Sequence, residues 1–168
     1  MRGLLDNRLA ALLGVAGPLL FLAGVILVSW SERDFIAELG WDNWPSGTAL
    51  GPNGWATVLV FLLTGLCQMA FARSLLAQAG ASTVRKLGAG LLVVSGFGMA
   101  MLAFKTDHPD AELTWHGVIH VVAYFTFFLG LHTRLRCAGV GVVEPARALV
   151  VDVRTARAPA VARRRRAP

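Results

Sequence analysis

Four long stretches without a charged side chain are the strongest constraint on what this chain can fold into. They cover residues 9–30, 55–72, 87–104 and 113–133 of the 168-residue sequence. A helix needs about 20 apolar residues to cross the roughly 30 Å hydrocarbon core of a bilayer. The composition agrees, since 55% of the residues are hydrophobic and only 15% are charged. We therefore predict an all-α, polytopic membrane protein whose residues 1–136 form a bundle of four transmembrane helices.

The charges between these stretches predict an orientation. Residues 32–53 and 105–112 hold seven of the ten acidic residues but only Arg33 and Lys105 among the sixteen basic ones. Because Lys and Arg are retained on the cytoplasmic side, both termini are predicted to be cytoplasmic in a multi-pass protein of the cell membrane. The tryptophans agree with this orientation as an interfacial belt, because all five lie at or beyond the outer ends of the spans: Trp30, Trp41, Trp44, Trp55 and Trp115.

The remaining segments are short or basic. Residues 32–39 predict a short helix lying flat on the outer membrane surface, with a Ser31-x-x-Asp34 start and Gly40 as its stop. Residues 41–47 and 51–54 predict turns. Residues 137–168 predict a disordered, basic cytoplasmic tail, which either is attracted to anionic lipid or has no role of its own. Without a folded nucleic-acid reader, these arginines point to the lipid bilayer as partner and not to nucleic acid.

Two patterns within the spans predict how the helices pack. The third stretch contains Gly88, Gly90, Gly96 and Gly98, which favour close approach of another helix. On the second helix one face carries polar residues at spacings of four and seven, and this face is predicted to look into the bundle: Asn53, Thr57, Thr64 and Gln68. Hydrogen bonds between helices are its main interpretation, and a transport path is the alternative.

Residues 106–120 concentrate the side chains that carry chemistry. His116 and His120 recur at a spacing of four, which suits two imidazoles on one metal ion. Asp107 and His108 precede them and complete a candidate set of zinc ligands, in which Asp107, His116 and His120 are the candidate catalytic residues. Further polar side chains are predicted to surround this set in the two outer loops: Arg33, Asp34, Glu38, Asp110 and Glu112.

Three interpretations of this polar cluster stay open. The histidines and carboxylates serve as ordinary structural hydrogen-bonding groups, as a metal site of a hydrolase acting on a lipid head group or an amide, or as a path for protons or a small substrate. No Glu lies between the two histidines, as it does in a zincin motif. Our default interpretation is an integral membrane protein of unassigned activity, non-catalytic and structural or partner-binding.

Several short segments, taken in order, resemble the prokaryotic membrane family called domain of unknown function 998 (DUF998). They are residues 17–24, 33–34, 36–40, 53–54, 106–107 and 115–120. The resemblance covers residues 17 to about 131, and it implies a fold and a membrane location without an activity. The family pattern usually has Pro where Lys105 stands and usually continues to six helices. This difference suggests that residues 137–168 are a truncated or frame-shifted end, and that exposed helix faces favour a homo-oligomer or a partner membrane protein.

Overall fold

The computed structural model describes residues 2–39, 45–108 and 110–133, and within these ranges it contains helices and no strand. The long helices are α1 (Arg2–Ser31), α3 (Gly54–Gln78), α4 (Thr83–Met101) and a last helix, Trp115–Thr133, which we call the fourth span. Two short helices precede α3, namely α2 (Arg33–Leu39) and the 3-10 helix η1 (Pro45–Leu50). Four of the described helices are long and apolar enough to cross a membrane. The prediction of an all-α, multi-pass membrane protein is therefore confirmed.

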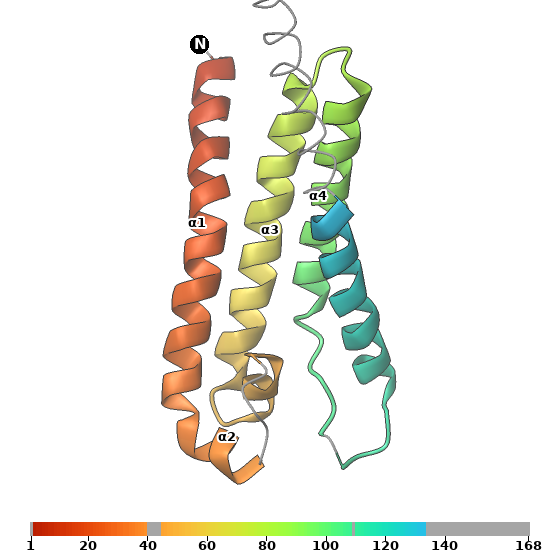
Figure 1. Cartoon of the computed structure of the whole chain (residues 1–168). Helices are drawn as coiled ribbons and strands as arrows, with labels where there is room; N and C mark the ends of the chain where they lie inside the picture. The colour runs from red at the N-terminus through yellow and green to blue at the C-terminus, as the bar shows by residue number, and fades with distance from the viewer. Residues whose placement is uncertain (1, 40–44, 109, 134–168) are drawn as a thin grey trace, which may run out of the picture.

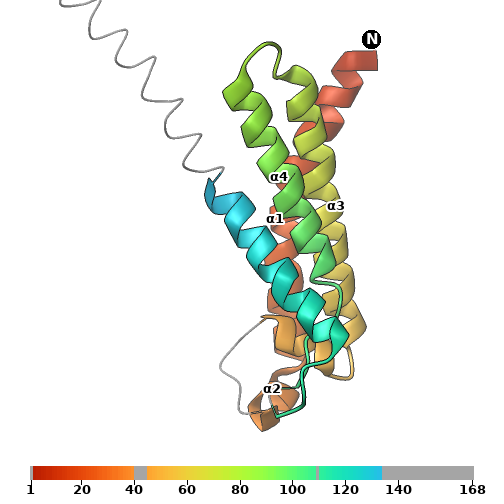
Figure 2. The ribbon, with the colours of Figure 1, turned by 90° about the vertical axis from the view of Figure 1, so that its right-hand side faces the viewer.

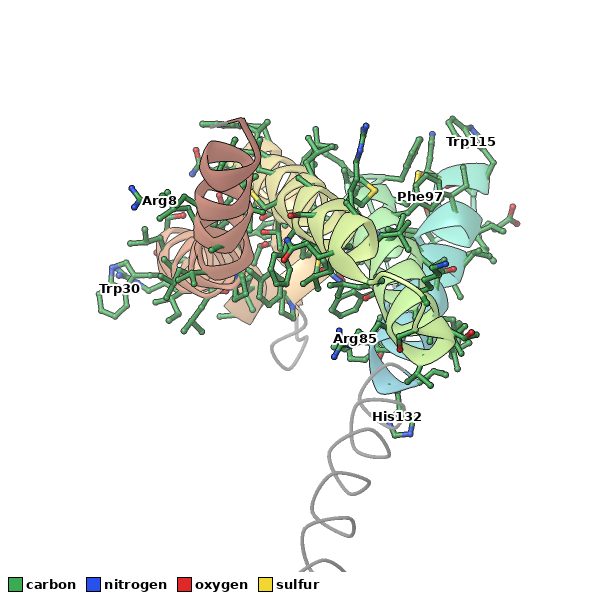
Figure 3. The ribbon with its side chains drawn as sticks, turned by 90° about the horizontal axis from the view of Figure 1, so that it is seen from above. Arg8, Trp30, Arg85, Phe97, Trp115 and His132 are labelled. Carbon is green, nitrogen blue, oxygen red and sulfur yellow. The ribbon has the colours of Figure 1, made fainter. Side chains whose placement is uncertain are left out.

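The long helices lie side by side in a simple order. α3 lies between α1 and α4, and the fourth span packs against α4 (Figures 1 and 3). The start of α1 and the turn between α3 and α4 lie at one end of the bundle (Figures 1 and 2). At the opposite end lie α2, η1 and residues 102–108 and 110–114, and we call this the loop end. The segments rich in acidic residues thus gather at the loop end.

Two helix ends differ from their predicted positions, the end of α3 and the start of α4. In both cases the prediction placed the end of the helix at a charged residue. α3 continues beyond Arg73 to Gln78, and α4 begins at Thr83, so the connector predicted over residues 73–86 shrinks to residues 79–82. In this turn Gly80 has a φ of +57°, a conformation that glycine adopts without strain. A long basic side chain can extend to the membrane surface while its backbone stays helical, so a charge ends the apolar run but not the helix.

The segment before α3 also differs in part from its prediction. Residues 45–50 form the 3-10 helix η1 where a turn was predicted for 41–47, and its residues Gly47, Thr48 and Ala49 are buried. α2 begins at Arg33 and ends at Leu39, close to the predicted helix over 32–39. Residues 40–44, the tail 137–168 and its predicted disorder lie outside the described residues.

Three of the five tryptophans are found where the interfacial belt was predicted. Trp30 lies in the last turn of α1, Trp55 lies in the first turn of α3 and Trp115 begins the fourth span, and all three side chains are exposed. Figure 3 shows Trp30 and Trp115 pointing away from the bundle on opposite sides. Trp41 and Trp44 lie outside the described residues.

Glycines bring the backbones of neighbouring helices into contact. A Cβ atom at Gly65 of α3 would lie 2.5 Å from the backbone nitrogen of Ala100 on α4, and one at Gly98 would lie 2.5 Å from the backbone nitrogen of Phe127. At such distances only a residue without a side chain fits. The prediction for the glycines of α4 is confirmed at Gly96 and Gly98, whereas Gly88 and Gly90 have no described neighbour within 4 Å.

A hydrogen-bonded chain links three helices inside the bundle. The Gln68 Nε2 donates to Ser95 Oγ at 3.0 Å, and Ser95 Oγ donates to the carbonyl oxygen of Phe127 at 3.0 Å. Ser95 is fully buried. Hydrogen bonds between helices contribute on average about 0.6 kcal/mol each in a membrane. The two hydrogen bonds therefore add little to stability. Their main effect is to set how far α3, α4 and the fourth span are shifted along one another.

The contrast between two glycines of α4 gives a direct test of this packing. Gly98→Ala is expected to lower the free energy of unfolding by about 1–3 kcal/mol, because the new methyl group meets the backbone of the fourth span. Gly88→Ala is the matched control on the same helix, and it is expected to leave stability unchanged or raise it by about 0.5–1 kcal/mol through helix propensity. Denaturant titration in detergent micelles measures both variants, and equal effects would contradict the packing described above.

Candidate functional site

Asp107 lies at the start of the fourth span and is bonded to Thr114, the residue before its first turn. The Thr114 hydroxyl donates to Asp107 Oδ1 at 2.6 Å, and the Thr114 backbone N–H donates to Asp107 Oδ2 at 2.7 Å. A Cβ atom at Gly117 would overlap the same carboxylate. Asp107 therefore sits over the N-terminal end of the helix, where unpaired N–H groups and the helix dipole favour a negative charge.

His116 extends this arrangement by one hydrogen bond. Its Nδ1 lies 2.8 Å from Thr114 Oγ1. Since the single hydroxyl proton of Thr114 is already donated to Asp107, His116 Nδ1 is the donor and the Thr114 oxygen the acceptor. The same oxygen accepts from the backbone N–H of Gly117 at 3.4 Å, as an N-cap residue does. His116, Thr114 and Asp107 thus form a donor chain that ends on the carboxylate.

His120 lies one turn further along and belongs to a different environment. Its side chain is buried, with 6% of the residue exposed. His120 Nδ1 donates to the carbonyl oxygen of Phe104 at 2.6 Å, which ties the loop after α4 to the fourth span. A carbonyl oxygen only accepts, so this bond fixes Nδ1 as the donor nitrogen. The ring lines a cavity of about 140 Å³.

The other predicted cluster residues are exposed and pair locally. His108 Nδ1 accepts from the backbone N–H of Asp110 at 3.3 Å. In the described part of the chain, Arg33 is paired with its neighbour Asp34 at 3.4 Å and lies 5.4 Å from the ring centre of Trp30. These side chains were predicted to surround one site. In the structure Asp34 is exposed, and so are two further acidic residues, Glu38 and Glu112.

The candidate zinc ligands are not gathered around one point. Within residues 2–39, 45–108 and 110–133, no three His, Cys, Asp or Glu side chains are placed to hold one metal ion. Both oxygens of Asp107 accept from Thr114, and the Nδ1 atoms of His116 and His120 point to different partners. In this structure the side chains of Asp107, His116 and His120 therefore make hydrogen bonds that connect parts of the fold. Metal binding stays a prediction.

Glu32 is a buried carboxylate that the sequence analysis did not select. Only 2% of the residue is exposed, and its Oε1 accepts from the backbone N–H of Asn53 at 2.7 Å. A Cβ atom at Gly51 would overlap this carboxylate as well. Glu32 thus joins the end of α1 to the start of α3. The sequence contained only a weak sign of this role. Glu32 is an acidic residue that comes directly after an apolar span, and a glycine, Gly51, follows in a segment predicted to be a turn.

The polar face of α3 is largely occupied by hydrogen bonds. Thr57 Oγ1 lies 2.6 Å from Thr48 Oγ1 of η1, and Gln68 is bonded to Ser95. Thr64 differs from both. It is buried, and its hydroxyl has no hydrogen-bond partner. The predicted role of this face in linking elements of the bundle is confirmed at Thr57 and Gln68, and Thr64 is the exception.

Hydrogen bonding lowers the pKa of Asp107. The Thr114 hydroxyl is the main cause and the Thr114 backbone N–H the second, and together they hold the pKa of Asp107 below its ordinary value of 3.8. A carboxyl group whose pKa is lower in the folded state stabilises the fold above its unfolded pKa. This contribution is lost as the pH falls through the lowered folded value.

Comparison with known proteins places the chain in one family. The family model described as "Protein of unknown function (DUF998)" matches residues 15–156. The match includes every residue of the polar cluster and extends beyond residue 131, where the resemblance seen in the sequence ended. No curated protein and no solved structure matches the chain.

The Asp107 carboxylate provides a test through the pH dependence of stability. Asp107→Asn is expected to lower the unfolding midpoint at pH 7, because the charge over the helix start is lost. The difference from the native protein is expected to shrink as the pH falls from about 5 through the lowered folded pKa of Asp107, because the unfolded carboxyl group takes up a proton in this range before the folded one does. Thermal unfolding in detergent over this pH range measures both proteins.

Asp110→Asn is the matched control for this test, because Asp110 is an exposed carboxylate of the same loop. Its unfolding midpoint is expected to follow that of the native protein at every pH. Parallel curves for Asp107→Asn and the native protein would show that Asp107 does not stabilise the start of the fourth span.

Proposed function

We propose, from the premise that the chain belongs to the DUF998 family of proteins of unknown function, that it is a non-catalytic integral membrane protein that acts by binding within the bilayer. The carrying observation is that the side chains best suited to chemistry are engaged in bonds that hold the fold. Asp107 and His116 are bonded to Thr114, and His120 is bonded to the Phe104 carbonyl. Groups used in this way hold the helix starts in place.

The arrangement of α3 favours binding over passage of a substrate. A polar path along this helix would need accessible side chains from its start to its middle. Asn53 at the start of this face is exposed, but Thr57, one turn later, is buried against Thr48 of η1. This contact supports a role of the face in packing and binding over passage of a substrate.

The proposal includes an orientation in the cell membrane with both termini cytoplasmic. It is supported by charge, because the loop-end segments hold most of the acidic residues and the remaining segments hold fourteen of the sixteen basic ones. A homo-oligomer or a partner membrane protein stays a prediction of the sequence analysis. The mass of the detergent-solubilised protein tests the oligomer.

Metal content separates the proposed function from a metal-dependent hydrolase. Native protein, His116→Ala and His120→Ala are purified in detergent, and bound metal is measured by mass spectrometry. We expect all three to contain far less than one metal ion per chain. His120→Ala is expected to lower the unfolding midpoint more than His116→Ala does, because the His120 ring is buried and bonded to Phe104, whereas His116 is exposed. Near-stoichiometric zinc in the native protein that is lost in both variants would favour the hydrolase.

Cysteine labelling tests the orientation. Single cysteines replace Asp110 at the loop end and Ala81 in the turn between α3 and α4, in a background without Cys67 and Cys137. A membrane-impermeant maleimide is expected to label Asp110→Cys in intact cells and Ala81→Cys only after the membrane is opened. The reverse pattern would show that the chain is inserted the other way.

A further inference from the structure

His120 has one ring nitrogen that the fold does not use. Its Nδ1 donates to the Phe104 carbonyl oxygen, whereas its Nε2 has no hydrogen-bond partner among the residues that the structure describes. Only 6% of the residue is exposed. A polar atom in buried, apolar surroundings costs free energy unless it finds a partner. Nε2 is therefore a polar atom for which the described fold supplies no partner.

The Nε2 atom of His120 is accessible from a cavity. Among the described residues, the Thr64 hydroxyl oxygen is the one buried side-chain N or O atom that lacks both a partner and accessible surface. Because Nε2 has no partner, it must keep accessible surface. The His120 ring lines the cavity of about 140 Å³, and its other nitrogen, Nδ1, is directed to the Phe104 carbonyl. Nε2 is thus the ring nitrogen that a ligand in this cavity can reach.

The rest of the cavity wall is aromatic and uncharged. None of the described residues that line it is Lys, Arg, Asp or Glu, and its other polar residues are Ser46 of η1 and Tyr124. A charged head group would enter this wall without a counter-charge, at a high cost in free energy. The wall therefore selects an uncharged ligand that has polar atoms at one end. Five aromatic residues contribute to the wall: Phe21, Phe61, Tyr124, Phe127 and Phe128.

A hydroxyl group is the partner that suits Nε2 best. With Nδ1 as a donor, Nε2 accepts a hydrogen bond when the ring is neutral and donates one when the ring is protonated. A hydroxyl group can take either role, whereas a carbonyl or ether oxygen can only accept. The presence of Ser46 and Tyr124 in the same wall favours a head group with more than one hydroxyl.

The position of His120 sets the depth of this hydroxyl in the bilayer. His120 follows Trp115, the first residue of the fourth span, by five residues, which is about 7.5 Å along the helix. Trp115 is exposed, as a tryptophan at the membrane–water interface is. His120 therefore lies below the head-group layer but above the middle of a hydrocarbon core of roughly 30 Å. An uncharged hydroxyl group can enter to this depth, whereas a charged phosphate stays at the surface.

A second cavity adjoins the first and provides space for an apolar chain. Its volume is about 290 Å³, and three residues line both cavities: Phe21, Met99 and Phe127. It extends away from the loop end, toward Gly14 of α1 and Leu131 of the fourth span. An apolar cavity of about 150 Å³ holds a molecule as large as benzene. The two cavities in series therefore have room for one long apolar chain below a small polar head.

We propose that the two adjoining cavities bind an uncharged single-chain lipid of the monoacylglycerol class. A glycerol hydroxyl forms the hydrogen bond to His120 Nε2, and the acyl chain lies along Phe21 and Phe127 in the second cavity. Both cavities are half-open, so the lipid can enter sideways from the bilayer. This inference rests on the proposed function, because it names the ligand class for binding within the bilayer.

Binding of radiolabelled monooleoylglycerol to the protein in lipid nanodiscs tests the proposal. Saturable binding near one molecule per chain is expected for the native protein. In His120→Asn the amide nitrogen takes the place of Nδ1 and keeps the bond to Phe104, but the side chain ends before Nε2. This variant is expected to bind about tenfold more weakly, which corresponds to one hydrogen bond. Its unfolding midpoint is expected to stay closer to that of the native protein than the midpoint of His120→Ala.

His116→Asn is the matched control, because it makes the same substitution one turn earlier on the same helix. His116 is exposed, and its Nδ1 is bonded to Thr114. It does not line either cavity. His116→Asn is therefore expected to bind monooleoylglycerol like the native protein.

A cavity-filling variant and two competitors keep the test decisive. Ser46→Leu places an apolar side chain in the first cavity and is expected to abolish saturable binding. Methyl oleate has the same chain but no hydroxyl, so as a competitor it is expected to be at least tenfold weaker than unlabelled monooleoylglycerol. Oleyl alcohol has one hydroxyl and is expected to compete more strongly than methyl oleate and more weakly than monooleoylglycerol.

Three results would overturn the proposal. They are linear, non-saturable uptake by the native protein, equal affinity of the native protein and His120→Asn, and equal competition by methyl oleate. The first would mean that membrane lipid or water alone fills the cavities. The bound lipid is also recovered and expected to be intact. Release of oleate would overturn the non-catalytic assignment while the lipid still binds, so the two failures are distinct.

Discussion

The need to pair every backbone N–H and C=O group inside a bilayer is the constraint on which this structure depends. Long helices meet that need along their length but leave the first N–H groups of each helix unpaired. At the loop end, the unpaired N–H groups are those at the starts of α3 and of the fourth span. Two carboxylates are placed there, Glu32 at the start of α3 and Asp107 at the start of the fourth span. Each is packed against a glycine, Gly51 or Gly117, which leaves space for the carboxylate.

This use of the carboxylates changes the meaning of the polar cluster. A histidine pair beside an aspartate resembles a catalytic constellation when it is read along the sequence. In three dimensions the donor chain from His116 through Thr114 to Asp107 ends on a helix cap, and His120 faces a loop carbonyl. The unexplained polarity lies elsewhere, at Thr64 in the middle of the bundle.

The sequence was a good guide wherever one physical rule acts alone. Apolar length predicted four spans, and the exposed positions of Trp30, Trp55 and Trp115 follow from their preference for the membrane surface. It was a poorer guide to helix ends, because Arg73 interrupts an apolar run without breaking the hydrogen bonds of α3. The sequence also pointed to acidic residues that are exposed, such as Asp34 and Glu38, and gave no clear sign of Glu32. Glu32 is buried because η1 and the start of α3 pack against the end of α1 in the folded chain.

By itself, the sequence determined the class of the protein: hydrophobic length and charge define membrane helices residue by residue, without knowledge of neighbours. The same local reasoning found the polar face of α3 and the glycines of α4. Only the tertiary structure decided which of these residues have partners. Gly98 meets the fourth span and Gly88 meets nothing described, Gln68 reaches Ser95, and Thr64 reaches no acceptor. The physical reason is that hydrogen bonds and close packing are short-range, and helix spacing within a few ångströms is set by all four helices together.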